Sequence, residues 1–96
     1  MKVYVISWSP LAEDSYLKTL SYILEKWTIK ETEDFESKVE SLLKKLKTHK
    51  WLCPPSHKQE NLRKCVISPQ TSLVYRINDD TIELVAFLDN RSQHQY

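Results

Sequence analysis

Apolar residues in the last third of the chain gather in three short runs, at residues 62–67, 72–77 and 81–88. So few residues separate the runs that only tight turns fit between them. We therefore expect three antiparallel strands in a meander, with Asn78, Asp79 and Asp80 forming its last turn. A run of alternating side chains at residues 2–8 predicts a further strand at the start of the chain.

Two amphipathic stretches separate this first strand from the meander. The first begins with Ser9 as a helix cap and Pro10 at the first helical position. The second begins with a capping box that pairs Thr28 with Glu31. Because the break between them is short, we expect an antiparallel helical hairpin. Each stretch carries one apolar stripe at helical spacing, made of Tyr16, Leu20, Ile23, Leu24 and Trp27 in the first and Phe35, Val39, Leu42, Leu43 and Leu46 in the second.

These elements predict an α+β fold, with a single sheet of four mostly antiparallel strands and the helical hairpin covering one of its faces. The pattern leaves open which strand lies beside the first one. A chain of 96 residues is typical of one domain, spanning residues 1–96. The residues expected in the core are Val5, Leu20, Ile23, Leu24, Phe35, Val39, Leu42, Leu46, Leu73, Tyr75, Leu84 and Ala86.

Composition narrows the possible functions. The chain contains no glycine, so the glycine-rich phosphate loops of P-loop and Rossmann proteins are excluded, and we expect no cofactor. Its net charge is only +1, although residues 41–64 hold seven Lys and Arg against one Glu. This excess fits either a solvated helix end or a small anion-binding patch. Because no apolar run could cross a bilayer and no signal peptide is evident, we expect a cytoplasmic protein without a membrane partner.

The two cysteines, Cys53 and Cys65, do not form a C-x-x-C pair. A cytosolic protein seldom keeps a disulfide, so we expect Cys65 to be a small core residue and Cys53 a loop or packing residue. A zinc site would need both cysteines together with His49 and His57, but this spacing matches none of the usual templates. We therefore expect no metal site.

Five short motifs follow one another along the chain: ISWSPLA at 6–12, YILEKW at 22–27, LRK at 62–64, LVYRINDD at 73–80 and DNR at 89–91. Together with the order of strand, helical hairpin and meander, they resemble the RelE/ParE family of toxins from bacterial type II toxin–antitoxin systems. The resemblance implies an antitoxin partner whose largely disordered segment folds over the toxin. Such a segment lays an amphipathic helix into an apolar groove or adds a strand to the sheet edge.

The same resemblance implies two possible activities. The RelE-like branch cleaves mRNA on the ribosome, and the ParE-like branch poisons DNA gyrase. We expect ribosome-dependent mRNA cleavage, with gyrase inhibition or non-catalytic protein binding as the alternative. Many RelE-like nucleases carry an arginine immediately before the L-V-Y motif, where this chain has Ser72. One phosphate-binding cation of the nuclease is therefore missing.

In a nuclease of this kind, cations hold the scissile phosphate while a nearby side chain moves protons for attack by the 2′-hydroxyl. Arg91 would hold the phosphate, oriented by Asp89, and Arg63 would supply a second cation across the sheet. Alternatively, Arg63 is a surface strand residue paired with Glu60 or Glu83, and the polar tail after Arg91 is frayed. The candidate catalytic residues are Arg63, Arg91, His94 and Tyr96.

Overall fold

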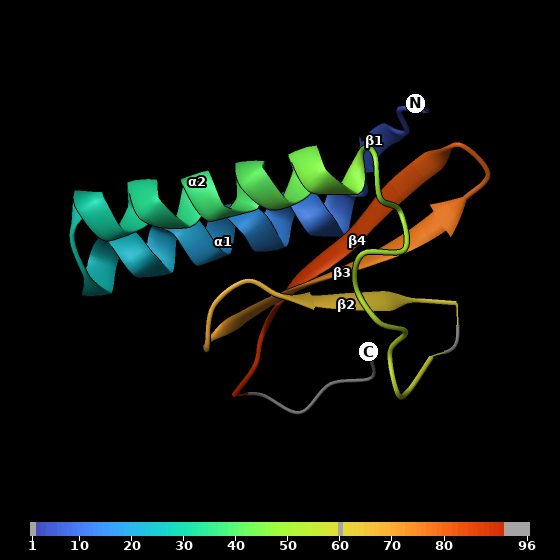
Figure 1. The fold of residues 1–96 in the computed structure, drawn as a ribbon. Helices are drawn as coiled ribbons and strands as arrows, with labels where there is room; N and C mark the ends of the chain where they lie inside the picture. Colours follow the sequence, from blue (N-terminus) through green and yellow to red (C-terminus); the bar gives the residue numbers. More distant parts are fainter. Residues whose placement is uncertain (1, 60, 92–96) are drawn as a thin grey trace.

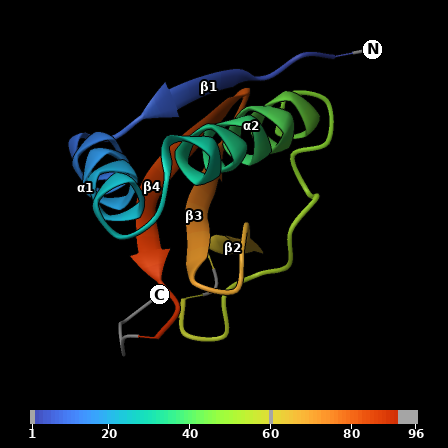
Figure 2. The same cartoon turned by 90° about the vertical axis from the view of Figure 1, so that its left-hand side faces the viewer.

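The computed structural model describes residues 2–59 and 61–91, which form two helices and one four-stranded sheet. The strands lie side by side in the order β1-β4-β3-β2, and both helices cover the same face (Figures 1 and 2). The predicted α+β fold is therefore confirmed. The elements are β1 (Val5–Trp8), α1 (Pro10–Lys26), α2 (Ile29–Leu46), β2 (Arg63–Val66), β3 (Thr71–Asn78) and β4 (Thr81–Asp89).

The first strand pairs with the last one. β1 runs parallel to β4, with Val5 opposite Thr81, so β1 forms one edge of the sheet and β2 the other. Strands β2, β3 and β4 form the predicted antiparallel meander. A parallel pair needs a long crossover connection, and here the helical hairpin and the rest of the meander supply it. The strand beside the first one, which the sequence pattern left open, is therefore β4.

Both helices begin at their predicted caps. The Ser9 Oγ accepts the N–H of Ala12 at 2.9 Å and donates to the carbonyl of Val85 at 2.8 Å, which ties the start of α1 to β4. The Glu31 carboxylate accepts the N–H of Thr28 at 3.1 Å, as a capping box requires. Neither of the two described helices is long and apolar enough to cross a membrane.

The turn between β3 and β4 forms without glycine. Asp79 has a φ of 54°, in the left-handed region. Aspartate tolerates this region better than most residues because its short side chain can form local hydrogen bonds. The predicted turn at residues 78–80 is therefore confirmed, and it keeps β3 and β4 in a tight hairpin.

The core lies between the hairpin and the sheet. Leu20, Ile23 and Leu42 are half-buried and pack against it. Most of the other predicted core residues are buried: Phe35, Val39, Leu46, Leu73, Tyr75, Leu84 and Ala86.

Two core predictions were wrong, since Val5 is 63% exposed and Leu24 is 53% exposed. In β1, which is an edge strand, Ile6 packs against the core while Val5 does not. Along α1, Ser15 accepts the N–H of Phe87 near the end of β4. Leu24 lies more than two turns farther along the helix, where the hairpin extends past the sheet (Figure 1).

The prediction of two separate packing cysteines was also wrong, because Cys53 and Cys65 form a disulfide with their Cα atoms 5.3 Å apart. The chain before β2 doubles back, so that Pro55 forms a β-bridge with Arg63. This reversal brings Cys53 next to the strand that holds Cys65. Both sulfur atoms are used in the disulfide, so neither can serve as a thiolate ligand for zinc.

Candidate functional site

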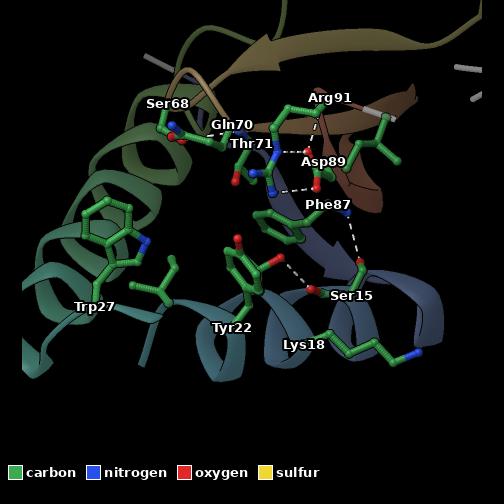
Figure 3. A pocket seen from close by; sticks show the side chains of 13 residues that line it. Ser15, Lys18, Tyr22, Trp27, Ser68, Gln70, Thr71, Phe87, Asp89 and Arg91 are labelled. Atoms are coloured by element: carbon green, nitrogen blue, oxygen red, sulfur yellow. Dashed lines mark hydrogen bonds and ion pairs between the residues drawn. The ribbon is translucent and has the colours of Figure 1, made fainter. Parts of the chain in front are cut away.

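Arg91, the first candidate, lies just after β4 at a cavity of about 400 Å³ between α1 and the end of the sheet (Figure 3). Residues of α1, the turn between β2 and β3, and the end of β4 line the cavity. Ile23 and Phe87 contribute apolar surface, and Tyr22 faces Arg91 from the helix. The cavity therefore combines apolar surface with two cationic side chains, Arg91 and Lys18.

The Arg91 guanidinium is held by a single carboxylate. Its Nε and Nη2 atoms donate to the two oxygens of Asp89 at 3.0 and 2.9 Å, and its backbone N–H donates to the same residue at 2.9 Å. Asp89 therefore contacts Arg91 as the sequence predicted, whereas the binding of a phosphate by Arg91 stays a prediction. These hydrogen bonds, with a smaller contribution from Tyr22, raise the pKa of Arg91 above its usual range. The negative charge of Asp89 also offsets the positive charge of Arg91, on which the binding of a phosphate would depend.

Arg63, the second candidate, belongs to a different group of side chains. Its Nη1 donates to the carbonyl of Cys53, and its guanidinium lies 4.6 Å from the centre of the Trp51 ring. The ammonium of Lys50 lies 5.5 Å from the same ring and 4.7 Å from the ring of Tyr4. We call Tyr4, Lys50, Trp51 and Arg63 the Trp51 cluster.

The expected ion pairs of Arg63 do not form among the described residues. Glu83 lies opposite Arg76 on the β3–β4 ladder and pairs with it. Glu60 lies outside the described residues. Contacts with a carbonyl and an aromatic ring hold Arg63, and no described carboxylate neutralises it.

The Tyr75 side chain contacts the backbone of the loop that carries Lys50 and Trp51. Its hydroxyl donates to the carbonyl of Lys50 at 2.8 Å and accepts the N–H of Cys53 at 3.3 Å. Burial raises the pKa of Tyr75, while the Cys53 N–H and the charge of Arg63 act in the opposite direction. The residue is fully buried, so this hydroxyl fixes the loop that carries Trp51.

The two candidate arginines lie far apart along the strands. Arg63 is opposite Tyr75, which is opposite Leu84, and Asp89 is five residues farther along β4. At about 3.4 Å per residue, this register separates the levels of Arg63 and Asp89 by about 17 Å. The structure therefore does not bring Arg91 and Arg63 to one phosphate. The other two candidates, at positions 94 and 96, lie outside the described residues, so their catalytic role stays a prediction.

Comparison with known proteins places this arrangement in a family. The sequence profile described as "ParE toxin of type II toxin-antitoxin system, parDE" matches residues 6–94. The chain belongs to the ParE toxin family. The resemblance to RelE/ParE toxins carried by the five sequence motifs is thus confirmed. A search among curated proteins finds no match to the sequence.

Solved structures of related toxins share the fold of this ParE-family chain. The chromosomal ParDE system of P. aeruginosa matches with a TM-score of 0.75 at 9% identity, over 91% of this chain and 96% of that one. The YoeB/ParE toxin of Agrobacterium tumefaciens gives 0.66 at 14% identity, over 94% and 99%. The YoeB dimer of Staphylococcus aureus gives 0.63 at 20% identity, over 88% and 94%. At such identities the likeness concerns the fold alone.

Ser72 has a structural role in this ParE-family toxin. It is fully buried, and its hydroxyl donates to the Oδ1 of Asn90 at 2.6 Å. The amide of Asn90 donates in turn to the carbonyls of Ser68 and Pro69, each at 3.2 Å. This network joins the start of β3 to the end of β4. A larger cationic side chain at position 72 would have no room without breaking it.

The sequence did not reveal the Trp51 cluster as a unit. The positive excess of residues 41–64 was a usable signal, because Lys50 and Arg63 both contribute to it. Grouping them with Tyr4 requires β1 to lie beside the end of α2, where the Tyr4 N–H donates to the carbonyl of Lys47 at 2.8 Å. That contact joins residues far apart in the chain.

Proposed function

We propose that this ParE-family chain is a toxin that arrests growth by binding an essential protein, DNA gyrase being the target that resemblance to the ParE-like branch of the family implies. One observation carries the proposal. Arg63 and Arg91, the two cations expected to flank a scissile phosphate, are separated by about five residues along the strands, or about 17 Å. A phosphate bound by one of these arginines would not reach the other, so the paired stabilisation of the transition state expected of the nuclease would be lost.

The cavity beside Arg91 gives further support. Besides Arg91 and Asp89, its described lining includes two titratable side chains, Lys18 and Tyr22. Lys18 forms an ion pair with Asp14 at 2.9 Å, and Tyr22 lies against the Arg91 guanidinium. No histidine or glutamate belongs to this part of the lining. The Asp89 carboxylate in the same described lining already accepts two hydrogen bonds from the Arg91 guanidinium, so it is not placed to take a proton from an attacking hydroxyl.

We infer that an antitoxin covers the exposed apolar side of the helical hairpin. Four large apolar residues of the helical hairpin are more than half exposed: Leu17 and Leu24 on α1, Trp27 in the turn and Ile29 at the start of α2. Exposed apolar groups of this size mark interaction surfaces when they gather together. Solved structures with this fold include toxin–antitoxin complexes. An amphipathic antitoxin segment would bury these side chains.

Co-expression tests the antitoxin partner. The product of the neighbouring gene should relieve growth arrest and co-purify with the toxin. A Leu24→Asp/Trp27→Asp variant should lose this complex, whereas Val5→Asp, at an exposed apolar residue on β1, should keep it. If the first variant kept the complex, the antitoxin would have to bind another surface of the toxin.

A supercoiling assay tests the target. Purified toxin, titrated against gyrase, should reduce supercoiling in a dose-dependent way, and the antitoxin should restore it. Toxin that arrests growth and leaves gyrase unaffected would refute the proposed target.

A further inference from the structure

The Trp51 cluster contains two cations that no described carboxylate neutralises. Neither Lys50 nor Arg63 belongs to any of the four ion pairs in the described part of the chain, which are Lys2–Asp80, Lys18–Asp14, Arg76–Glu83 and Arg91–Asp89. Both cations lie over the ring of Trp51, which is 63% exposed. Such a group offers an anion two charges beside a large apolar surface.

The cluster is fixed in place before any ligand binds. The Cys53 carbonyl holds Nη1 of Arg63, and the disulfide joins Cys53 to Cys65 on β2. The Tyr75 hydroxyl holds the backbone of Lys50. Nε and Nη2 of Arg63 have no described acceptor, so they present a planar fork that suits a carboxylate. Preorganisation of this kind lowers the entropic cost of binding.

An apolar groove continues the surface beside Trp51. Leu52, the next residue, is 45% exposed and lines a groove of about 510 Å³ between α2 and β2. Val66 lines the groove from β2, while Lys38 and Lys45 line it from α2. The combined surface therefore places cations beside apolar side chains. A segment that alternates acidic with apolar residues would match it.

Two observations favour a protein segment over a nucleic acid. The Trp51 ring already carries two cations, and a stacking base would have to displace at least one. The acidic turn of Asp79 and Asp80 lies at the same end of the sheet, where Asp80 pairs with Lys2 at 2.6 Å and Lys2 lies near the ring of Tyr4. This turn adds negative charge beside the cluster, which disfavours a phosphate backbone with one charge on every nucleotide more than a segment in which acidic residues alternate with apolar ones.

We propose that the Trp51 cluster and the adjoining groove form a docking site for an acidic, apolar segment of a partner protein. This proposal holds whether or not gyrase is the target, since it concerns the chemistry of the surface. The carboxylate would bind the free side of Arg63 and Lys50, and apolar side chains would enter the groove beside Leu52 and Val66.

Three probes test the site: a short synthetic peptide rich in aspartate and leucine, the same peptide with asparagine in place of aspartate, and a single-stranded oligonucleotide of matched length. Binding is followed through the indole N–H resonance of Trp51, assigned with Trp51→Phe. The aspartate peptide should bind at least about tenfold more tightly than the asparagine peptide. Arg63→Gln/Lys50→Gln should remove that advantage, and the matched control Arg76→Gln/Lys18→Gln should keep it.

Three outcomes would overturn the proposal. The two peptides could bind equally well, the Arg63→Gln/Lys50→Gln variant could keep the preference for aspartate, or the oligonucleotide could be the tightest ligand. An unchanged thermal unfolding curve for the variant would show that a loss of binding does not arise from misfolding.

Discussion

The Tyr75 hydroxyl donates to the carbonyl of Lys50 at 2.8 Å and so ties the middle of β3 to the loop that carries Trp51. The same hydroxyl accepts the N–H of Cys53 at 3.3 Å. Tyr75→Phe would leave both backbone groups unpaired beside the core and should lower the free energy of unfolding by about 1–3 kcal/mol. Denaturant unfolding measures this loss. Tyr22→Phe, at an exposed tyrosine, should change stability by less than half as much.

Alkaline pH should destabilise the fold. Burial raises the pKa of Tyr75 and of Tyr16 above the ordinary value of 10.0. The folded state therefore favours the protonated hydroxyls, and this stabilisation is complete below pH 10 and lost as the pH rises through the folded-state pKa values. Unfolding measured between pH 9 and pH 11 should become easier as the pH rises. Tyr75→Phe should show a shallower decline, and an equally steep one would contradict the role of this residue.

The disulfide between Cys53 and Cys65 should contribute measurably to stability. The two cysteines are 12 residues apart, and closing a loop of about that length stabilises a fold by about 2–3 kcal/mol. Thermal unfolding should therefore shift to lower temperature in a thiol reductant. Cys53→Ser/Cys65→Ser should unfold at the lower temperature with or without reductant. If the reductant left the unfolding temperature of the wild-type protein unchanged, the disulfide would not stabilise the toxin.

Two leucines of similar helical spacing should respond differently to truncation. Leu46 is fully buried at the end of α2, whereas Leu24 is 53% exposed near the end of α1. Leu46→Ala should cost about 2–5 kcal/mol, because it leaves a cavity in the core. Leu24→Ala should cost less than about 1 kcal/mol. Equal losses in denaturant unfolding would contradict the placement of the hairpin.

Local sequence signals predicted the elements well. Ser9 and Thr28 are helix caps whose partners lie three residues away, and Asp79 shapes a two-residue turn. Such features depend on neighbouring residues alone. The wrong core predictions, Val5 and Leu24, depended instead on where the sheet ends. An apolar stripe shows which side of a helix is apolar and does not show how far the other layer reaches.

The separation of the two arginines follows from the meander itself. β2 and β4 are both antiparallel to β3, so they run in the same direction. Arg63 stands at the start of β2 and Arg91 follows the end of β4, which places them far apart along the strands. The strand pattern alone could have excluded a shared phosphate. The disulfide was not predictable in this way, because it depends on a loop whose path back to β2 leaves no local pattern.

The integrity of mRNA in a translating extract tests the account most directly. Purified toxin is added at a concentration that inhibits gyrase supercoiling, and the ends of the mRNA molecules are mapped by primer extension. If the toxin acts by binding a protein target, the messages should stay intact while gyrase supercoiling falls. Cleavage of the mRNA that Arg91→Ala abolishes would contradict the account and would support the mRNA-nuclease activity instead.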